Sequence, residues 1–392
     1  MDLSKSKNGI SSDYDGEASA GAELVEKQLP IWIGQQLAPG NPLYNMAFAF
    51  HIRGELDTAA FRRAWRDVVD ACRVLRTGIV ERNGSPVRIL LPQGRNSCQI
   101  VDLSGSAEPH EAWGRFANSR SREAFPLEGP LAESALVQLG GSHHIWYLNQ
   151  HHLITDAWST VLVFRAVERR YRDILAGEAQ KPPSIPDYDE VVASVGGMAR
   201  GSIDEAVRSH WQQRAGGEGK AFAFYGDSRQ PASNRTRRLS EALGRDRSDR
   251  IRQIRDQPGF LSLTPQISEF SIFATVLVAW LNRITGLAGA IGFDTPVQCR
   301  PTPEAKECPG LFIEMFPFAV ELQEGETFRA LGERCLAETQ LLLRNAIPGA
   351  TKELDGNPGS VVLNYFSGTF GEFDGREVSV DWLHPGHGDQ VH

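Results

Sequence analysis

Two adjacent histidines are the residues of this chain whose type and position best suit chemistry. His151 and His152 follow a strand-like run at 145–148 and precede a helix-like run at 160–175. Because successive side chains of a strand point to opposite faces, one histidine can brace the fold while the other faces a cavity. Asp156 lies in the turn that follows, where its carboxylate can cap the next helix or pair with a base from elsewhere.

Alternating strand and helix patterns surround these residues and must position them. Gly140 and Gly141 predict a hairpin turn that leads into the histidine strand. Apolar residues spaced three and four apart predict a helix through Phe61, Trp65 and Val68 that packs one face on a sheet. Further strands are expected at 47–53, 87–91, 98–101, 135–139 and 290–297, and further helices at 111–123, 248–255 and 264–284. The pattern is that of an α/β protein.

Length and composition limit the classes of function. The chain has 392 residues and a net charge of −8, which suits about two domains of roughly 150 residues each and argues against nucleic-acid binding. The longest apolar run, at 272–281, is too short for a membrane span, and a signal-peptide core is not evident. Five scattered cysteines without a CxxC pair predict reduced thiols in the cytoplasm and no zinc ribbon.

Composition also predicts how the chain divides. Residues 1–28 are mostly polar and are expected to form a flexible leader. The proline-rich segment at 181–186 reads as a linker between an N-terminal subdomain at 29–180 and a C-terminal subdomain at 186–392.

Several motifs, in order, resemble those of the condensation domains of nonribosomal peptide synthetases, a family of chloramphenicol acetyltransferase-like acyltransferases. The segment from His151 to Asp156 resembles the HHxxxDG signature of this family. The other matching segments span roughly residues 30–385 and include Trp32 with Gln36-Leu37, Tyr44-Asn45, Gly54-Glu55-Leu56-Asp57, Leu75-Arg76-Thr77, Pro296 to Arg300, Gly310 to Pro317, and Val361 to Tyr365. A lone HHxxxD is a weak signal, whereas several ordered motifs around it are a specific one.

The sequence departs from the family pattern at a few positions. Ala157 stands where glycine is usual, and alanine costs roughly 1 kcal/mol if that position requires a positive φ. Ala71, Cys72 and Arg73 replace the usual Arg, His and Glu, and Glu314 replaces an asparagine. Family members usually continue for some tens of residues beyond the point that corresponds to His392, so we expect the C-terminal subdomain to be truncated at its end.

The resemblance implies two acetyltransferase-like subdomains in a V-shaped pseudo-dimer, with the active site at their junction. His152 is the expected catalytic residue, whereas a satisfied core histidine is the alternative. His151 is expected to brace the loop. The resemblance implies a buried ion pair between Asp156 and Arg300, in preference to a triad of Asp156 with His152. Losing one partner of such a pair costs on the order of 3–5 kcal/mol.

Three further residues are candidates for contact with substrate. Ala157 could narrow the channel beside His152, and Asn364 could donate a hydrogen bond where the subdomains meet. Ser159 is expected to cap a helix, with an oxyanion donor as the alternative. No metal site is expected, because the spacing of His143, His144, His151 and His152 is not HExxH and no cysteine or carboxylate set completes a site.

The implied reaction is the attack of an acceptor amine on a donor acyl thioester. An α-amino group has a pKa near 8, so an imidazole with a pKa near 6.5 can accept its proton or hold it in place. The implied partners are donor and acceptor carrier proteins that bring phosphopantetheine arms, while the chain itself binds no cofactor. It is expected to act as a monomer or as part of a multidomain synthetase. The alternatives are a stand-alone acyltransferase acting on a soluble alcohol or amine, and a degenerate domain that recruits partners.

Overall fold

The computed structural model describes residues 21–140, 142–202, 205–215, 235–286, 289–354, 361–383 and 385–386, with the side chains of 198–202, 215 and 353 left aside. The chain divides into two compact units. Unit 1 comprises Met1–Ile154, Val163–Asp189 and Gly371–Leu383, and unit 2 comprises Thr155–Leu162, Glu190–Phe370 and His384–His392.

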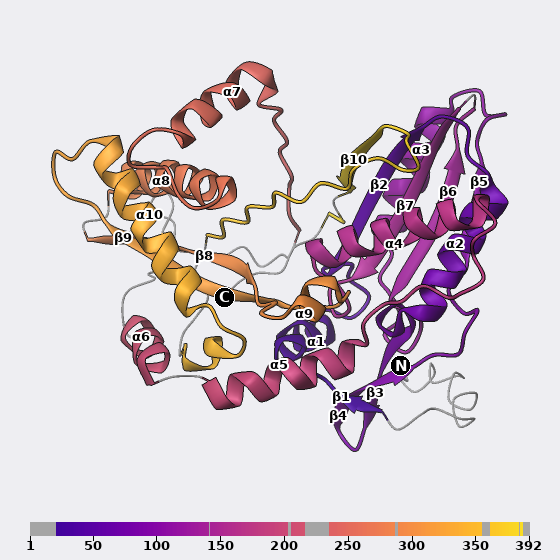
Figure 1. The fold of residues 1–392 in the computed structure, drawn as a ribbon, viewed down its shortest axis with the longest axis horizontal. Helices are drawn as coiled ribbons and strands as arrows, with labels where there is room; N and C mark the ends of the chain where they lie inside the picture. The colour runs from indigo at the N-terminus through magenta and orange to yellow at the C-terminus, as the bar shows by residue number, and fades with distance from the viewer. Residues whose placement is uncertain are drawn as a thin grey trace, which may run out of the picture. The chain divides into compact units, whose positions relative to one another are not determined.

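A five-stranded sheet organises the described part of unit 1 (Figure 1). Its strand order is β10-β2-β7-β6-β5, and its pairs are antiparallel except for β5 with β6. The strands are β2 (Asn45–Arg53), β5 (Cys98–Asp102), β6 (Ala132–Gln138), β7 (His143–His151) and β10 (Val378–Leu383). The predicted hairpin is therefore present, because β6 leads into β7 through Gly140, whose φ is +103°.

Helices cover both faces of this sheet because its central strands are apolar on both sides. On one face, Trp146 of β7 contacts Phe61 of α2 (Thr58–Ala71) with ring centroids 5.3 Å apart. The same ring stacks on Phe164 of α4 (Ala157–Leu175) at 5.7 Å. On the other face, Trp113 of α3 (Pro109–Ser121) packs among buried residues of the sheet, namely Ala47, Ala49, Ala135, Val137, Ile145 and Tyr147.

The N-terminal part of unit 1 is ordered earlier than the sequence predicted. Strand β1 (Ala22–Glu23) pairs with β4 (Ser85–Leu90), which also pairs with β3 (Thr77–Arg82). The short helix η1 (Glu26–Gln28) and helix α1 (Leu29–Leu37) follow β1. Part of the predicted leader at 1–28 is thus structured, since Ala22–Glu23 pair with β4 and Glu26–Gln28 form η1, whereas residues 1–20 lie outside the described part.

The described part of unit 2 is built on the antiparallel pair β8 (Ala290–Gln298) and β9 (Ile313–Glu321). Helices α8 (Pro265–Thr285) and α10 (Phe328–Asn345) pack against this pair and against each other. Their shared core contains Trp211, Ala274, Val278, Leu281, Ile291, Phe293, Phe316, Phe318, Leu331 and Leu342. The remaining helices are α5 (Tyr188–Ser202), α6 (Glu205–Ala215), α7 (Gly244–Arg255), α9 (Pro303–Glu307) and η4 (Ala350–Glu353), and η2 (Arg73–Arg76) belongs to unit 1.

Helix α8 extends well beyond the apolar run noted in the sequence. By length and composition alone, its 21 residues would allow it to cross a membrane. Buried core helices meet the same criterion, and Ala274, Val278 and Leu281 of α8 lie in the core of unit 2. The helix begins with Thr264, whose hydroxyl accepts a hydrogen bond from the Ile267 N–H, and ends at Gly286 with φ +63°.

The division into units differs from the predicted subdomain boundaries. Six residues of β10 pair with β2, so Gly371–Leu383 belongs to unit 1 rather than to the C-terminal subdomain. Conversely, Thr155–Leu162 belongs to unit 2. Near the expected linker, the change of unit falls between Asp189 and Glu190. The V-shaped arrangement and an active site at the junction of the subdomains stay predictions.

The altered segment after α2 is accommodated by local contacts. Cys72 is 2% exposed, and burial raises the pKa of its thiol to about 12. Arg73 forms an ion pair with Asp187 at 2.9 Å within unit 1. A buried neutral thiol and a surface ion pair therefore occupy the place of the usual Arg, His and Glu.

The place of the C-terminal segment in unit 1 can be tested at Phe373, which precedes β10. Its side chain is fully buried against Phe61, Trp146, Phe164 and Tyr171. We expect Phe373→Ala to lower the free energy of unfolding by about 3–5 kcal/mol, because it opens a cavity in an aromatic core.

Urea denaturation followed by tryptophan fluorescence measures this loss. Trp382→Ala is the matched control, since Trp382 is 45% exposed in the same segment, and we expect it to cost less. Equal, small losses for both variants would show that the segment does not complete the core of unit 1.

Candidate active site

His151, the last residue of β7, is held as a neutral brace. It is 1% exposed, and its backbone N–H donates to the Leu131 carbonyl at 2.8 Å. The ring Nδ1 accepts a hydrogen bond from the Leu153 N–H at 3.1 Å, so Nε2 carries the proton that faces Gln35 Oε1 at 3.2 Å. Burial, followed by the neighbouring His152, lowers the pKa of His151 to about 3. The bracing contact to the backbone is the one expected from the sequence.

Two glutamines that the sequence analysis did not single out hold this brace. Gln35 of α1 donates from Nε2 to the carbonyls of Ala38 and Asn41, at 3.1 and 3.0 Å, which directs its Oε1 toward His151. Gln28 donates to the Leu153 carbonyl at 2.7 Å and closes the turn from the other side. Gln35 lies next to the first motif of the resemblance, but a sequence motif does not show which backbone groups an amide contacts.

His152 is the residue that follows His151, and it is partly exposed. Its backbone N–H donates to the Tyr44 carbonyl at 2.8 Å, and the Tyr44 ring lies against His151 with centroids 5.8 Å apart. This packing requires Gly34, because a Cβ at that position would lie 1.9 Å from the Tyr44 hydroxyl. The backbone of the candidate catalytic residue is therefore anchored by Tyr44; the residue as a whole is partly exposed, and its ring Nδ1 is buried.

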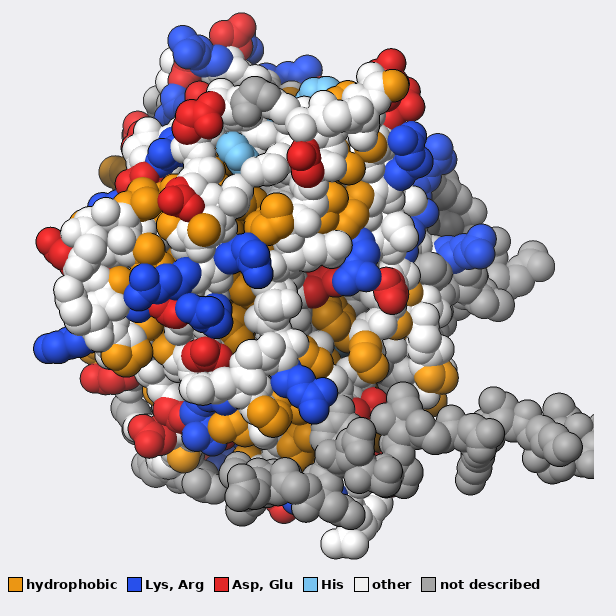
Figure 2. All heavy atoms as spheres, turned by 90° about the vertical axis from the view of Figure 1, so that its right-hand side faces the viewer, with side chains coloured by type: hydrophobic (Ala, Val, Ile, Leu, Met, Phe, Trp, Pro, Cys, Tyr) orange, Lys and Arg blue, Asp and Glu red, His pale blue; other side chains and the backbone are white. Residues whose placement is uncertain are grey.

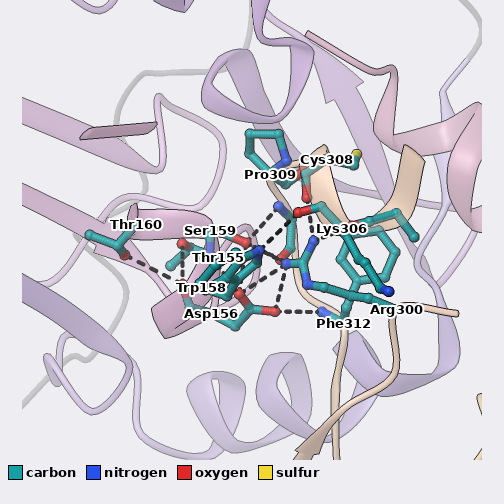
Figure 3. A network of polar contacts seen from close by, with 12 residues as sticks. Thr155, Asp156, Trp158, Ser159, Thr160, Arg300, Lys306, Cys308, Pro309 and Phe312 are labelled. Atoms are coloured by element: carbon teal, nitrogen blue, oxygen red, sulfur yellow. Dashed lines mark hydrogen bonds and ion pairs between the residues drawn. The ribbon is translucent and has the colours of Figure 1, made fainter. Parts of the chain in front are cut away.

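Asp156 and Arg300 form a buried ion pair within unit 2 (Figure 3). Their side chains are 1% and 2% exposed, and Arg300 NH2 lies 3.0 Å from both Oδ1 and Oδ2 of Asp156. Asp156 Oδ2 also accepts from the Phe312 N–H at 3.0 Å, and Oδ1 from the Ser159 N–H at 2.8 Å. The carboxylate therefore caps the N-terminus of α4 and pairs with Arg300 at once.

Arg300 makes further contacts in the same network. Its NH1 donates to the carbonyls of Ala305 and Cys308, and its guanidinium lies 4.2 Å from the centroid of the Phe312 ring. The expected ion pair is thus present and extensively hydrogen-bonded, which is the condition under which a buried charge pair is tolerated.

The hydroxyl of Ser159 is enclosed by this network and is fully buried. It accepts from Gly310 N–H at 2.9 Å and from Arg300 NH2 at 2.8 Å. Its own proton faces Asp156 Oδ1 and the Gly310 carbonyl. The expectation that Ser159 caps the helix is wrong, since Asp156 does so, and the hydroxyl has no proton left for an oxyanion.

The other two candidate substrate contacts occupy different settings. Ala157 is the first residue of α4 and is partly exposed. Among the described residues, the non-glycine positions with positive φ are Asn83 and Asp374, so the expected strain at Ala157 is absent. Asn364 is exposed and follows Leu363, whose N–H donates to the Asp294 carbonyl at 2.9 Å. Its contact with substrate stays a prediction.

The four histidines of the hairpin do not share one site. His143 and His144 begin β7, and His151 and His152 stand at its end, so the two pairs are separated by eight strand steps, or about 26 Å. A pocket of about 260 Å³ in unit 1 is lined at 95–97, 120, 123–126, 130, 132 and 133. This lining contains none of the predicted site residues, but its Phe125 ring lies edge-on to His151 with centroids 6.3 Å apart.

The stability of unit 2 should depend on the ion pair. We expect Arg300→Ala to lower the free energy of unfolding by about 3–5 kcal/mol, because it leaves the Asp156 charge buried without a partner. Asp156→Asn combined with Arg300→Met should cost less than Arg300→Ala, since no charge is then buried. Chemical denaturation measures the loss of stability in both variants. Glu111→Ala, which removes one partner of an exposed ion pair, is the control and should cost less than about 1 kcal/mol.

His151 should make stability depend on pH. Its folded pKa, about 3, lies below the ordinary value of 6.5, so the unfolded chain binds the proton first as pH falls. The contribution of neutral His151 to the free energy of unfolding is therefore fully present above pH 6.5. It is lost as the pH falls from 6.5 to 3, at up to about 1.4 kcal/mol per pH unit. His151→Gln should remove this slope in denaturation curves measured from pH 7 to 5. Parallel slopes for both proteins would contradict a neutral buried imidazole.

Comparison with known proteins relates this site to a family of synthetases. A linear gramicidin synthase of Brevibacillus parabrevis is 29% identical over 209 residues, which are 52% of this chain and 3% of that protein. Isonitrile lipopeptide synthase of Streptomyces coeruleorubidus is 26% identical over 344 residues, 85% of this chain and 22% of that protein. The chain therefore spans less than a quarter of the length of either relative.

Solved structures have the same fold. The first condensation domain of the calcium-dependent antibiotic synthetase, in complex with a substrate analogue, gives a TM-score of 0.78 at 24% identity, covering 94% of this chain and 86% of that one. A variant of the starter condensation domain of rhizomide synthetase, in complex with C8-CoA, gives 0.78 at 21% identity, covering 94% and 84%. The chain thus has the mixed α/β fold with two chloramphenicol acetyltransferase-like lobes. A family model described as Condensation domain matches residues 20–348, and with the HHxxxD histidines and the Asp156–Arg300 pair in place this chain belongs to the condensation-domain family.

Proposed function

We propose that this chain forms an amide bond between two carrier-bound substrates. The amine of the acceptor attacks the carbonyl carbon of a donor acyl thioester, the C–S bond breaks, and the donor carrier leaves as a free thiol. The observation that supports this best is the arrangement around the histidines: His151 is held by its hydrogen bonds, while His152 follows it with an anchored backbone and is partly exposed as a residue.

His152 is the residue we assign to proton transfer or to holding the amine. A protonated amine has no lone pair for attack, and a neutral imidazole can accept the proton that is released as the C–N bond forms. The state of its neighbour favours this role. Because burial holds the pKa of His151 near 3, that ring is neutral at pH 7 and adds no repulsive charge when His152 gains a proton.

Direct attack without an acyl-enzyme fits the residues around the site. The hydroxyls in and next to the motif are engaged, because Thr155 donates to the Asp156 carbonyl at 3.2 Å and Ser159 donates within its own network. All five cysteines are buried, and burial raises the pKa of Cys72, Cys98 and Cys335, which disfavours their thiolates. The remaining sources of rate are proximity of the two substrates and one positioned base.

The proposed partners are donor and acceptor carrier proteins whose phosphopantetheine arms deliver the substrates. Support comes from the relatives, which are synthetases of which this chain matches a small part. We further propose that the chain works in the cytoplasm, as a monomer or as part of such a synthetase, and that it takes its phosphopantetheine from partners rather than binding it itself.

A stand-alone acyltransferase is the second candidate, and one observation favours it. The starter condensation domain with a similar fold was solved with C8-CoA, a soluble acyl donor. A soluble acyl-CoA and a carrier-bound acyl group present the same thioester to an attacking amine. The two candidates therefore differ in whether a carrier protein or coenzyme A bears the acyl thioester, and not in the chemistry of His152.

The role of His152 predicts a defect in turnover rather than in binding. We expect His152→Ala to lower kcat for amide formation by about 100-fold or more, the usual contribution of a positioned acid or base, with carrier binding unchanged. Mass spectrometry of the acceptor carrier measures product. His210→Ala, on α6, is the matched control and should keep wild-type turnover.

The same assay separates the candidate functions. An acyl-carrier donor and an acyl-CoA donor are supplied in parallel, each with a carrier-bound or a free amine. Transfer confined to the carrier-bound pair supports condensation, and equal use of the soluble donor and acceptor supports the stand-alone enzyme. Carrier binding without product in the wild type, or undiminished product in His152→Ala, contradicts the proposed catalysis.

A further inference from the structure

An exposed and extended segment of unit 2 carries a serine that the proposed acyl transfer does not use. Residues 235–243 lead into α7 (Figure 1), and every one of them is exposed. Apart from a single bridge residue at Arg235, the segment belongs to no helix or strand. Leu239 is 87% exposed, so apolar packing does not hold this part of the segment. Ser240 therefore presents its hydroxyl at the surface, where it has no hydrogen-bond partner among the described residues.

The residues in front of Ser240 are basic. Arg237 and Arg238 stand three and two positions before it. Paired arginines at these two positions are the charge pattern by which one class of serine kinase selects its substrates, because their guanidinium groups pair with carboxylates that line the kinase cleft. The acidic residue that follows the serine, Glu241, already pairs with Arg247 at 3.4 Å, which offsets its charge.

The surrounding sequence reinforces this charge pattern. Residues 235–255 contain eight arginines and three acidic residues, although the chain as a whole has a net charge of −8. On the face of the molecule shown in Figure 2, in contrast, basic and acidic side chains are interspersed. A kinase with an acidic cleft is therefore attracted to this segment, while the net charge of the whole chain repels it.

The backbone around Ser240 is ready to enter a kinase cleft. A serine inside a helix reaches such a cleft only after local unfolding, whereas an exposed, extended segment needs none. Ser248 shows the difference, because it also follows an arginine at the third position before it, Arg245. Its hydroxyl donates to the Gly244 carbonyl at 2.7 Å within α7, and the residue is only partly exposed. The sequence thus offers two candidate serines, and the structure favours Ser240.

We propose that Ser240 is a phosphorylation site for a serine kinase that selects basic residues. The Ser240 Oγ attacks the γ-phosphorus of ATP, and an Oγ–P bond forms. The bond between the γ-phosphorus and the β,γ-bridging oxygen breaks, so ADP leaves. The hydroxyl proton passes to the catalytic base of the kinase. The site lies outside the histidine motif and is independent of the proposed acyl transfer.

Phosphorylation changes the electrostatics of the segment and of α7. A phosphoserine brings a charge of about −1.5 to −2 at pH 7 into a stretch with an excess of arginines, and it reduces their mutual repulsion. It also places negative charge in front of a helix N-terminus, where the helix dipole favours it. Leu243, the N-cap of α7, supplies no side-chain hydrogen bond to this end. The modification is therefore expected to stabilise α7 and the segment before it.

Incubation of the full chain with ATP and the catalytic subunit of cyclic-AMP-dependent protein kinase, a kinase of this selectivity, tests the proposal. Peptide mass spectrometry locates the phosphate, and we expect it at Ser240 in the folded chain. Ser240→Ala should remove it. Arg237→Ala and Arg238→Ala should each lower kcat/KM for phosphorylation by about tenfold or more, because each removes a charge-assisted contact. A kinase that selects acidic residues should not modify Ser240.

Ser248→Ala is the matched control, since it removes the other serine that follows an arginine at this spacing, and it should be phosphorylated as the wild type is. Undiminished incorporation in Ser240→Ala, or phosphate at Ser240 only after the chain is unfolded in urea, overturns the site. The phosphorylated chain should have a higher Tm at low salt, and salt should shrink the difference. An unchanged Tm at low salt overturns the stabilisation of α7.

Discussion

The buried pair of Asp156 and Arg300 is the interaction on which the candidate site depends. An unpaired charge in this position would cost several kcal/mol, so the two side chains constrain everything that touches them. The carboxylate fixes the first turn of α4 through the Ser159 N–H and the start of β9 through the Phe312 N–H. The guanidinium fixes the turn between Ala305 and Gly310 through their carbonyls. One ion pair thus joins the first turn of α4 to the stretch from Ala305 to Phe312, which lies far later in the sequence.

The two ends of the signature motif, His151 and Asp156, are anchored by separate sets of contacts. His151 is held by residues of unit 1, namely Leu131, Gln35 and Leu153, and Asp156 by residues of unit 2. His152 is the next residue after the first anchor and lies four residues before the second. Within unit 1, the backbone of His152 is held by the hydrogen bond of its N–H to the Tyr44 carbonyl and by the adjacent His151 brace.

The sequence was informative where local patterns and strong electrostatics act alone. Alternation and turn residues located β6, the Gly140 hairpin and β7, and the cost of an unpaired carboxylate pointed to a cation for Asp156. Contacts between residues that are distant in sequence could not be predicted. The amide of Gln35 and the pairing of β10 with β2 depend on chain closure that no local pattern encodes. Ser159 was misassigned because a hydroxyl at the third helical position and one at the cap look alike in sequence.

The departures from the family pattern bear on whether the domain is active or degenerate. A buried polar group without a partner costs stability whether or not a site is active, and three altered positions show how this cost is avoided. Glu314 accepts from the Gly349 N–H at 3.0 Å and from the Thr351 hydroxyl at 2.9 Å. Cys72 is buried as a neutral thiol, and Ala157 begins a helix in a conformation that favours alanine over glycine by about 1 kcal/mol. Local contacts at Glu314, Cys72 and Ala157 thus show how the fold accommodates these departures.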